Sequence, residues 1–304
     1  MNQPYVDRTF LLNTTYLDKF KELISDLSIE VKKNHDAKKK DFIVKPRAPG
    51  VYPAIILVHD WWGLDDHARM VAMRFAKEGF IVLAPSLYRG EMTARADVAR
   101  HLMRYLTPDD AYNVILEGYR QLVNMPDVAK ERIGIIGFQM GGYHALQAAV
   151  NMKVFGAASA FYGRFPKSIV EDLMHINCPV LFFTGGSEDW FEQEEIKAME
   201  KGFAEHKMNA RVQKYDHVGL SFFDDLHMEG YDYISAENAW NHAVQFFKGN
   251  LKEKKLATFP RMRKWVGPAM GGLVDWIEKS PMGAKILSLF EEAFGDEMPE
   301  QKKN

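Results

Sequence analysis

Cysteine is almost absent from this sequence, which has Cys178 and no other among its 304 residues. A single thiol cannot form a disulfide within the chain, and low cysteine usage agrees with a reducing compartment. Cys178 stands before Pro179 and the apolar run VLFF. We therefore expect it to enter a buried strand as a small hydrophobic residue.

The sequence also lacks a strong charge of one sign and a long apolar run. Its formal net charge is -2, which gives no reason to expect a nucleic acid or an anionic membrane as the main partner. No apolar run approaches the roughly 20 residues that span a bilayer. The N-terminus lacks the basic-then-apolar order of a signal peptide. We expect a cytoplasmic protein with no transmembrane segment.

Short β-rich apolar runs alternate with helical stretches between residues 42 and 244. Such alternation predicts βαβ units and a mostly parallel sheet covered by helices on both faces. The runs are DFIV, AIILV, FIVLA, IGIIG, VFGAASAF, VLFF and RVQKY, and the helices are expected over residues 68–80, 108–124 and 235–249. This pattern indicates one α/β domain over residues 41–250.

An extension is expected at each end of this domain. Residues 1–40 contain apolar residues at helical intervals over 16–27 and then a lysine-rich linker, so we expect a helical N-terminal extension.

The C-terminal extension, residues 251–304, begins with a basic stretch and continues into a predicted helix. Ser280 is its N-cap, Pro281 its first residue and Gly295 its stop. It either packs on the main domain or across a dimer, or it docks on a membrane or a partner protein. The alternatives differ in whether three large apolar side chains are buried, namely Trp265, Trp276 and Phe290.

The stretch GFQMGG at residues 137–142 has the spacing of a nucleophile elbow, in which a strand turns sharply into a helix. Its middle position holds Gln139, where hydrolase chemistry needs serine, cysteine or aspartate. Gly137, Gly141 and Gly142 suit a corner too tight for side chains. The glycine spacings of dinucleotide and P-loop sites are absent, so we do not expect a phosphate cradle.

Five stretches in the correct order make the region from Phe42 to Lys248 resemble the dienelactone hydrolase family of α/β-hydrolases. They are LVHDWWGL (57–64), GFIVLAPSLYRG (79–90), GFQMGG (137–142), TGGSEDWF (184–191) and YDHVGLSFFDD (215–225). The resemblance implies an α/β-hydrolase fold, with the helical extensions added at both ends.

The resemblance also implies a catalytic triad, and this chain departs from it. The family needs a cysteine or serine at the elbow, an acid and a histidine, and these positions hold Gln139, Asp189 and Leu220. Glu188 could replace Asp189 as the acid. A glutamine amide does not titrate usefully and leucine cannot accept a proton, so covalent ester hydrolysis is not expected.

Six further residues are expected to line the old pocket and bind a ligand. Asp60 matches a family glutamate near the nucleophile, so it either hydrogen-bonds Gln139 or acts as an acid/base on a bound ligand. His217 could replace the missing base, and Arg89 either binds a substrate carboxylate or is a surface residue. The remaining expected pocket residues are Trp61, Met140 and Tyr162.

Two other histidines lie outside this set. His59 is expected to brace its loop, whereas His227 either replaces the missing base or is a surface residue. No metal and no cofactor are expected.

These features predict a non-catalytic pseudoenzyme that binds a small ligand in the old pocket or acts as a scaffold. An enclosed pocket would favour ligand binding, and a collapsed one would favour scaffolding. The alternative is an active enzyme with rebuilt chemistry, either a hydrolase that uses His217 or a lyase, isomerase or cyclase that uses Asp60. A protein partner or a second copy would bind through the C-terminal extension.

Overall fold

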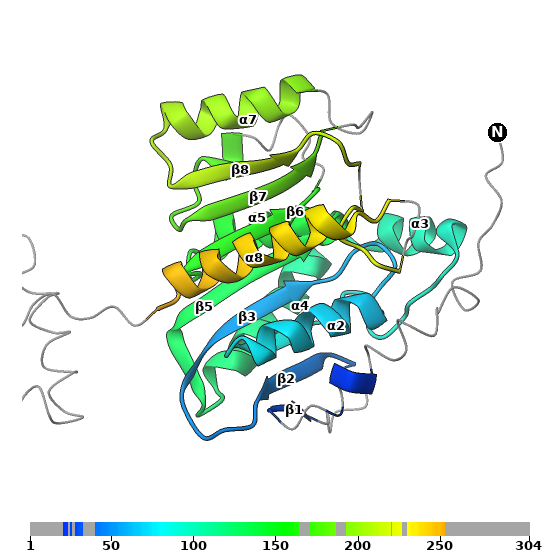
Figure 1. The fold of residues 1–304 in the computed structure, drawn as a ribbon, viewed down its shortest axis with the longest axis vertical. Helices are drawn as coiled ribbons and strands as arrows, with labels where there is room; N and C mark the ends of the chain where they lie inside the picture. The colour runs from blue at the N-terminus through cyan, green and yellow to red at the C-terminus, as the bar shows by residue number, and fades with distance from the viewer. Residues whose placement is uncertain are drawn as a thin grey trace, which may run out of the picture. The chain divides into compact units, whose positions relative to one another are not determined.

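An eight-stranded sheet forms the centre of the described part of the molecule (Figure 1). This computed structural model describes residues 21–23, 25, 28–32, 40–163, 171–186, 193–219, 221–226 and 230–252. The strand order is β1-β2-β4-β3-β5-β6-β7-β8. The strands are β1 (Ile29–Lys32), β2 (Phe42–Pro46), β3 (Tyr52–Val58), β4 (Ile81–Ala84), β5 (Val128–Phe138), β6 (Ala157–Phe161), β7 (Val180–Gly185) and β8 (Ala210–Tyr215).

The six strands from β4 to β8 in this order run parallel, and the edge formed by β1 and β2 is antiparallel. The register sets the candidate site, because Val58 lies opposite Gly137 and Phe138 lies opposite Phe161. The carboxyl ends of β3, β5 and β6 therefore meet at one edge of the sheet, where α/β proteins place their ligands.

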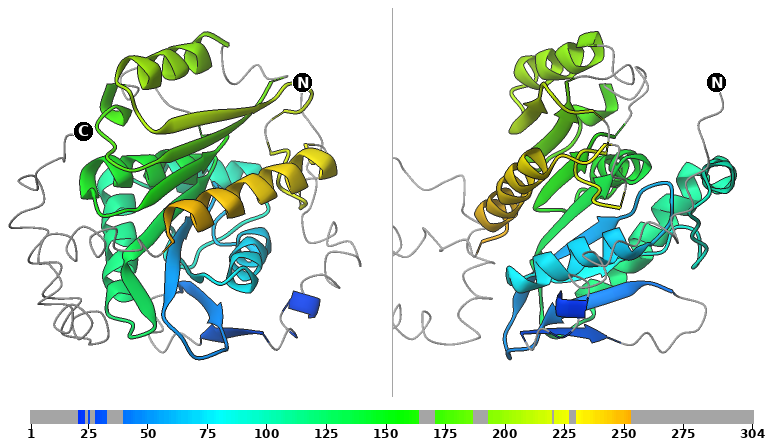
Figure 2. Two further views of the ribbon diagram at one scale, coloured as in Figure 1. Left: turned by 60° about the vertical axis from the view of Figure 1, so that its left-hand side comes forward. Right: turned by 45° about the vertical axis from the view of Figure 1, so that its right-hand side comes forward.

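Helices cover both faces of the sheet (Figure 2). One apolar cluster contains residues of α2 (Asp66–Lys77) and α8 (Tyr233–Asn250). The other contains residues of α4 (Pro108–Val123), α5 (Met140–Met152) and α7 (Gln193–Glu205). Alternate strand residues face opposite clusters, as the pleat requires: the first cluster takes Ile55 and Leu57, and the second takes Ile56 and Val58.

Capping residues set where three of these helices begin. Asp65 accepts a hydrogen bond from the backbone N–H of Ala68 at the start of α2, and Asp232 accepts one from Ser235 at the start of α8. Thr107 caps α4, which has proline at its first position. Each cap satisfies an N–H group that has no partner within its helix.

All seven predicted strands and the three helices predicted within the α/β domain are confirmed within a few residues. Cys178 is buried as expected, and burial raises the pKa of its thiol to about 11. Among the described residues, no helix is long and apolar enough to cross a bilayer.

The expected N-terminal boundary was wrong in one respect. The segment assigned to a helical extension contains β1, which pairs with β2 and belongs to the sheet. The sequence pattern also gave no prediction for α3 (Ala96–Tyr105) or α7. The predicted extension over residues 251–304, with Trp265, Trp276 and Phe290, lies outside the described residues apart from Leu251 and Lys252.

Candidate functional site

The corner between β5 and α5 has the geometry of a nucleophile elbow. Gln139 lies between the two elements with φ 49° and ψ -115°, a backbone conformation that costs a non-glycine residue on the order of 1–3 kcal/mol. A Cβ on Gly137 would lie 2.0 Å from the carbonyl oxygen of Gly141, and one on Gly141 would lie 2.2 Å from that of His59. The expected role of the glycines is confirmed, since the corner has no room for side chains there.

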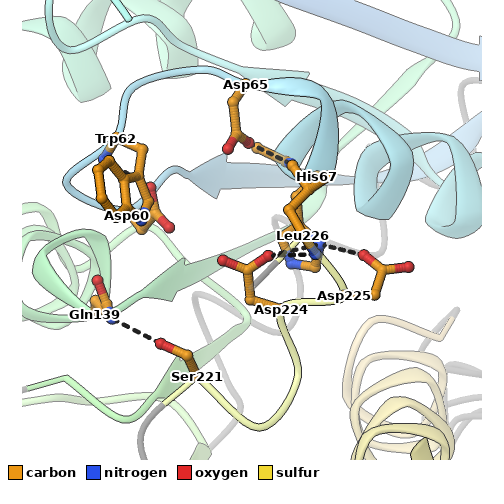
Figure 3. Close-up of polar contacts among 10 residues, drawn as sticks. Asp60, Trp62, Asp65, His67, Gln139, Ser221, Asp224, Asp225 and Leu226 are labelled. Atoms are coloured by element: carbon orange, nitrogen blue, oxygen red, sulfur yellow. Dashed lines mark hydrogen bonds and ion pairs between the residues drawn. The ribbon is translucent and has the colours of Figure 1, made fainter. Parts of the chain in front are cut away.

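The Gln139 side chain has a different partner from the one expected. Its Nε2 donates to Ser221 Oγ over 3.0 Å (Figure 3). Ser221 belongs to the loop after β8 and has φ 66°, so both partners hold left-handed backbone conformations. The hydrogen bond expected between Gln139 and Asp60 is wrong, because the Gln139 amide contacts Ser221. Asp60 Oδ1 accepts from the backbone N–H of Trp62 over 2.8 Å.

His59 braces the loop at the end of β3, as expected. Its Nδ1 lies 2.7 Å from the carbonyl oxygen of Asp60, and its Nε2 accepts from the backbone N–H of Leu87 over 3.0 Å. Because the N–H of Leu87 donates to Nε2, the proton of the neutral ring lies on Nδ1. Nδ1 therefore donates a hydrogen bond to the backbone carbonyl oxygen of Asp60. Burial lowers the pKa of His59 to about 4, so the ring stays neutral and structural at physiological pH.

Two of the expected pocket residues, Trp61 and Met140, contact Tyr88. Tyr88 Oη lies 3.3 Å from the carbonyl oxygen of Trp61 and 3.2 Å from Met140 Sδ. Burial raises the pKa of Tyr88, and the Asp60 carboxylate raises it further. Burial and the charges of Asp224 and Asp60 likewise raise the pKa of Tyr162. Both phenols therefore remain protonated at neutral pH.

Two expected ligand-binding residues lie elsewhere. His217 Nε2 is 3.2 Å from Ser235 Oγ and 3.9 Å from Asp232 Oδ1, and its side chain is 69% exposed. The ring is thus engaged at the start of α8, and its role as a replacement base stays a prediction from the sequence. Arg89 is exposed in the turn after β4, which agrees with the surface alternative.

Three residues weighed from the sequence, Asp189, Leu220 and His227, lie outside the described residues, as does Glu188. The acid and histidine positions of the triad therefore stay predictions from the sequence.

The sequence did not indicate a buried cluster of His67, Asp224 and Asp225, in which the two aspartates lie on the same loop as Ser221. His67 of α2 has its Nδ1 3.0 Å from Asp225 Oδ1 and 3.7 Å from Asp224 Oδ1 (Figure 3). The side chains of His67 and Asp224 are 8% and 4% exposed. Asp224 is oriented by the backbone N–H of Leu226, which donates to its Oδ1 over 2.9 Å.

The electrostatics of this cluster favour a cation. Burial alone would lower the pKa of His67, but the carboxylates of Asp224 and Asp225 outweigh it and raise the pKa to about 9. Asp65 adds to the effect. His67 is therefore an imidazolium at neutral pH, unless something else supplies the positive charge.

A small pocket adjoins the cluster. Its lining includes His67 and Asp225 together with Arg74, Phe223 and Tyr231. The other ring nitrogen of His67, Nε2, is buried and has no hydrogen-bond partner among the described residues. Because an unpaired buried N–H costs about 1–3 kcal/mol, a water molecule or ligand in this pocket would stabilise the site.

The comparison with protein families agrees with the fold. The sequence profile of the dienelactone hydrolase family matches residues 40–251, which is more than half of the chain. The chain belongs to the dienelactone hydrolase family. Among similar family members is a putative carboxymethylenebutenolidase of Aquifex aeolicus, which is 26% identical over 231 residues, 74% of this chain and 98% of that protein. A probable 2-oxo-3-(5-oxofuran-2-ylidene)propanoate lactonase of a Bradyrhizobium species is 24% identical over 70% of this chain and 90% of its own length.

Solved structures of dienelactone hydrolases share the fold. A putative dienelactone hydrolase from Klebsiella pneumoniae superposes with a TM-score of 0.65 at 22% identity, covering 72% of this chain and 98% of that one. The dienelactone hydrolase from Anabaena variabilis gives a TM-score of 0.56 at 19% identity, covering 74% and 100%. Both confirm the predicted α/β-hydrolase fold.

Proposed function

We propose that this dienelactone hydrolase family member binds a small ligand beside its elbow and does not hydrolyse it through a covalent intermediate. The observation that carries the proposal is Gln139 at the elbow corner, with its amide engaged by Ser221. The amide nitrogen has no available lone pair and cannot be activated by a base. In hydrolases that use a catalytic triad, removal of the nucleophile or its base lowers turnover by a factor on the order of 10⁶.

The surroundings of the elbow support ligand binding. Asp60 and Trp61 are only partly buried, and so are Gln139 and Met140. They offer a carboxylate, an aromatic face and an amide within one region. These groups suit a small ring compound with hydrogen-bonding oxygens. The Bradyrhizobium relative named as a probable lactonase makes lactones the first compounds to test.

The experiment measures hydrolysis of p-nitrophenyl acetate and of a dienelactone. We expect the wild-type protein to be silent with both compounds, and the double variant Gln139→Ser/Leu220→His to gain ester turnover. Binding of the intact lactone to the wild type, measured by calorimetry, tests the ligand-binding half. Wild-type ester turnover that Gln139→Ala abolishes would contradict the proposal.

A second candidate is acid/base chemistry by Asp60 on a bound ligand, in a lyase, isomerase or cyclase. The specific observation is the position of Asp60: its charge acts on the phenols of Tyr88 and Tyr162, which both remain protonated. A carboxylate and a phenol near one ligand can remove and return a proton. Turnover of the lactone without hydrolysis, lost in Asp60→Asn and kept in Gln139→Ala, would favour this candidate.

A further inference from the structure

The donor atoms of the His67 cluster have the chemistry of a metal site. One imidazole nitrogen and two carboxylate oxygens lie within 4.8 Å of one another. Imidazole suits zinc and other late transition metals, and carboxylates bind them as well, whereas calcium and magnesium favour sets made of oxygen alone. The mixed set therefore favours a divalent transition metal.

The distances agree with this choice. Zinc binds nitrogen and carboxylate oxygen at about 2.0–2.2 Å, so two ligands of a tetrahedral ion lie about 3.4 Å apart. The His67 nitrogen is 3.0 Å and 3.7 Å from the two carboxylate oxygens. Small side-chain movements would bring all three atoms to an ion between them.

The carboxylates around His67 favour a positive charge at its ring. Asp224 and Asp225 act on it most strongly, and Asp65 adds to their effect. Arg74 lines the adjoining pocket, but its guanidinium donates to Glu237 over 2.8 Å and lies 4.1 Å from the centre of the Trp240 ring. It does not neutralise the cluster. A divalent ion would replace the proton on Nδ1 and would bring one more positive charge than the imidazolium does.

We propose that His67, Asp224 and Asp225 bind a divalent transition-metal ion such as Zn²⁺. Three protein ligands leave a coordination position for water, and the adjoining pocket, which His67 and Asp225 both line, has space next to them. The ion would tie α2 to the loop 221–226, and through Ser221 it would hold the Gln139 side chain in place. This proposal does not depend on the function proposed for the elbow.

The test is calorimetric titration of the full-length, tag-free protein with ZnCl₂ after removal of metal with EDTA. We expect one ion per chain. Asp225→Asn and His67→Gln should each weaken binding at least about 100-fold, since even residues behind the ligands cost 10–100-fold. His206→Gln is the matched control, because His206 is exposed and its Nδ1 lies 3.0 Å from the carbonyl oxygen of Gly202, away from the cluster residues. It should bind like the wild type.

The pH series adds a readout that a purely structural cluster would not give. Zinc must displace the proton of His67, so its affinity should rise as the pH rises toward 9. Absence of zinc binding by the wild type, or equal binding by Asp225→Asn, would overturn the proposal and leave the cluster an ion pair. If circular dichroism shows that His67→Gln does not fold, the affinity of Asp225→Asn alone tests the proposal. Asp225 is less buried than His67, with a side chain that is 18% exposed, so its substitution disturbs the fold less.

Discussion

The elbow and the His67 cluster teach opposite lessons about what a sequence can reveal. At the elbow, the sequence keeps the glycines of a catalytic corner and the structure confirms the corner, yet the reacting group is glutamine. At the cluster, no motif marks the residues, yet the structure gathers a histidine and two carboxylates in a buried place. The elbow has the backbone geometry of a catalytic corner without a reacting side chain. The His67 cluster has chemically active side chains that belong to no sequence motif.

The largest expected effect is on stability, and it tests whether the fold requires glycine at the elbow corner. A Cβ added by Gly141→Ala would lie 2.2 Å and 2.4 Å from the backbone carbonyl oxygens of His59 and Val58. We expect the free energy of unfolding to fall by about 4 kcal/mol or more, measured by urea denaturation. Gly249→Ala is the control, since nothing lies within 4 Å of its added methyl group. An unchanged urea midpoint for Gly141→Ala would show that the corner tolerates a side chain.

The second prediction concerns the cluster and the stability of the metal-free protein in EDTA. The pKa of His67 rises from 6.5 to about 9 on folding, so its stabilising contribution is complete below pH 6.5 and is lost as the pH rises through 9. We expect the stability difference between the wild type and His67→Gln to shrink by on the order of 2 kcal/mol across this window. Urea denaturation on both sides of it gives the measurement. A difference that does not vary with pH would mean that His67 is not charged in the fold.

The smallest effect separates the hydrogen bond of Ser221 from its backbone strain. Both Ser221→Ala and Ser221→Gly remove the partner of Gln139, at a cost of about 1 kcal/mol. Because Ser221 has φ 66°, glycine should recover about 1 kcal/mol that alanine does not. Thermal denaturation of the two variants gives the comparison. Equal stabilities would indicate that the loop relaxes and that the backbone conformation carries no cost.

The sequence predicted the fold well because its signals were local. Runs such as AIILV have the length and composition of a buried strand, and the helices on both faces of the sheet bury them. The strand β1 was missed because its four residues precede a lysine-rich segment, and only pairing with β2 makes them a strand. Tertiary context decides such short elements.

The candidate site was predicted in part. The elbow and the bracing role of His59 follow from short motifs, and the structure bears both out. The pairing of Gln139 with Ser221 joins residues 82 positions apart, and His67 meets Asp225 across 158 positions. No spacing rule reaches so far, so the three-dimensional structure was needed to find both contacts.

The measurement that tests the central claim most directly is the intact mass of the protein after incubation with an organophosphate such as paraoxon, which labels activated nucleophiles. The account predicts no added mass on the wild-type chain, and one phosphoryl adduct per chain on Gln139→Ser/Leu220→His, where a serine and a histidine restore the reacting pair. An adduct on the wild-type chain, mapped to the elbow or to Ser221, would contradict it, because the site would then hold an activated nucleophile.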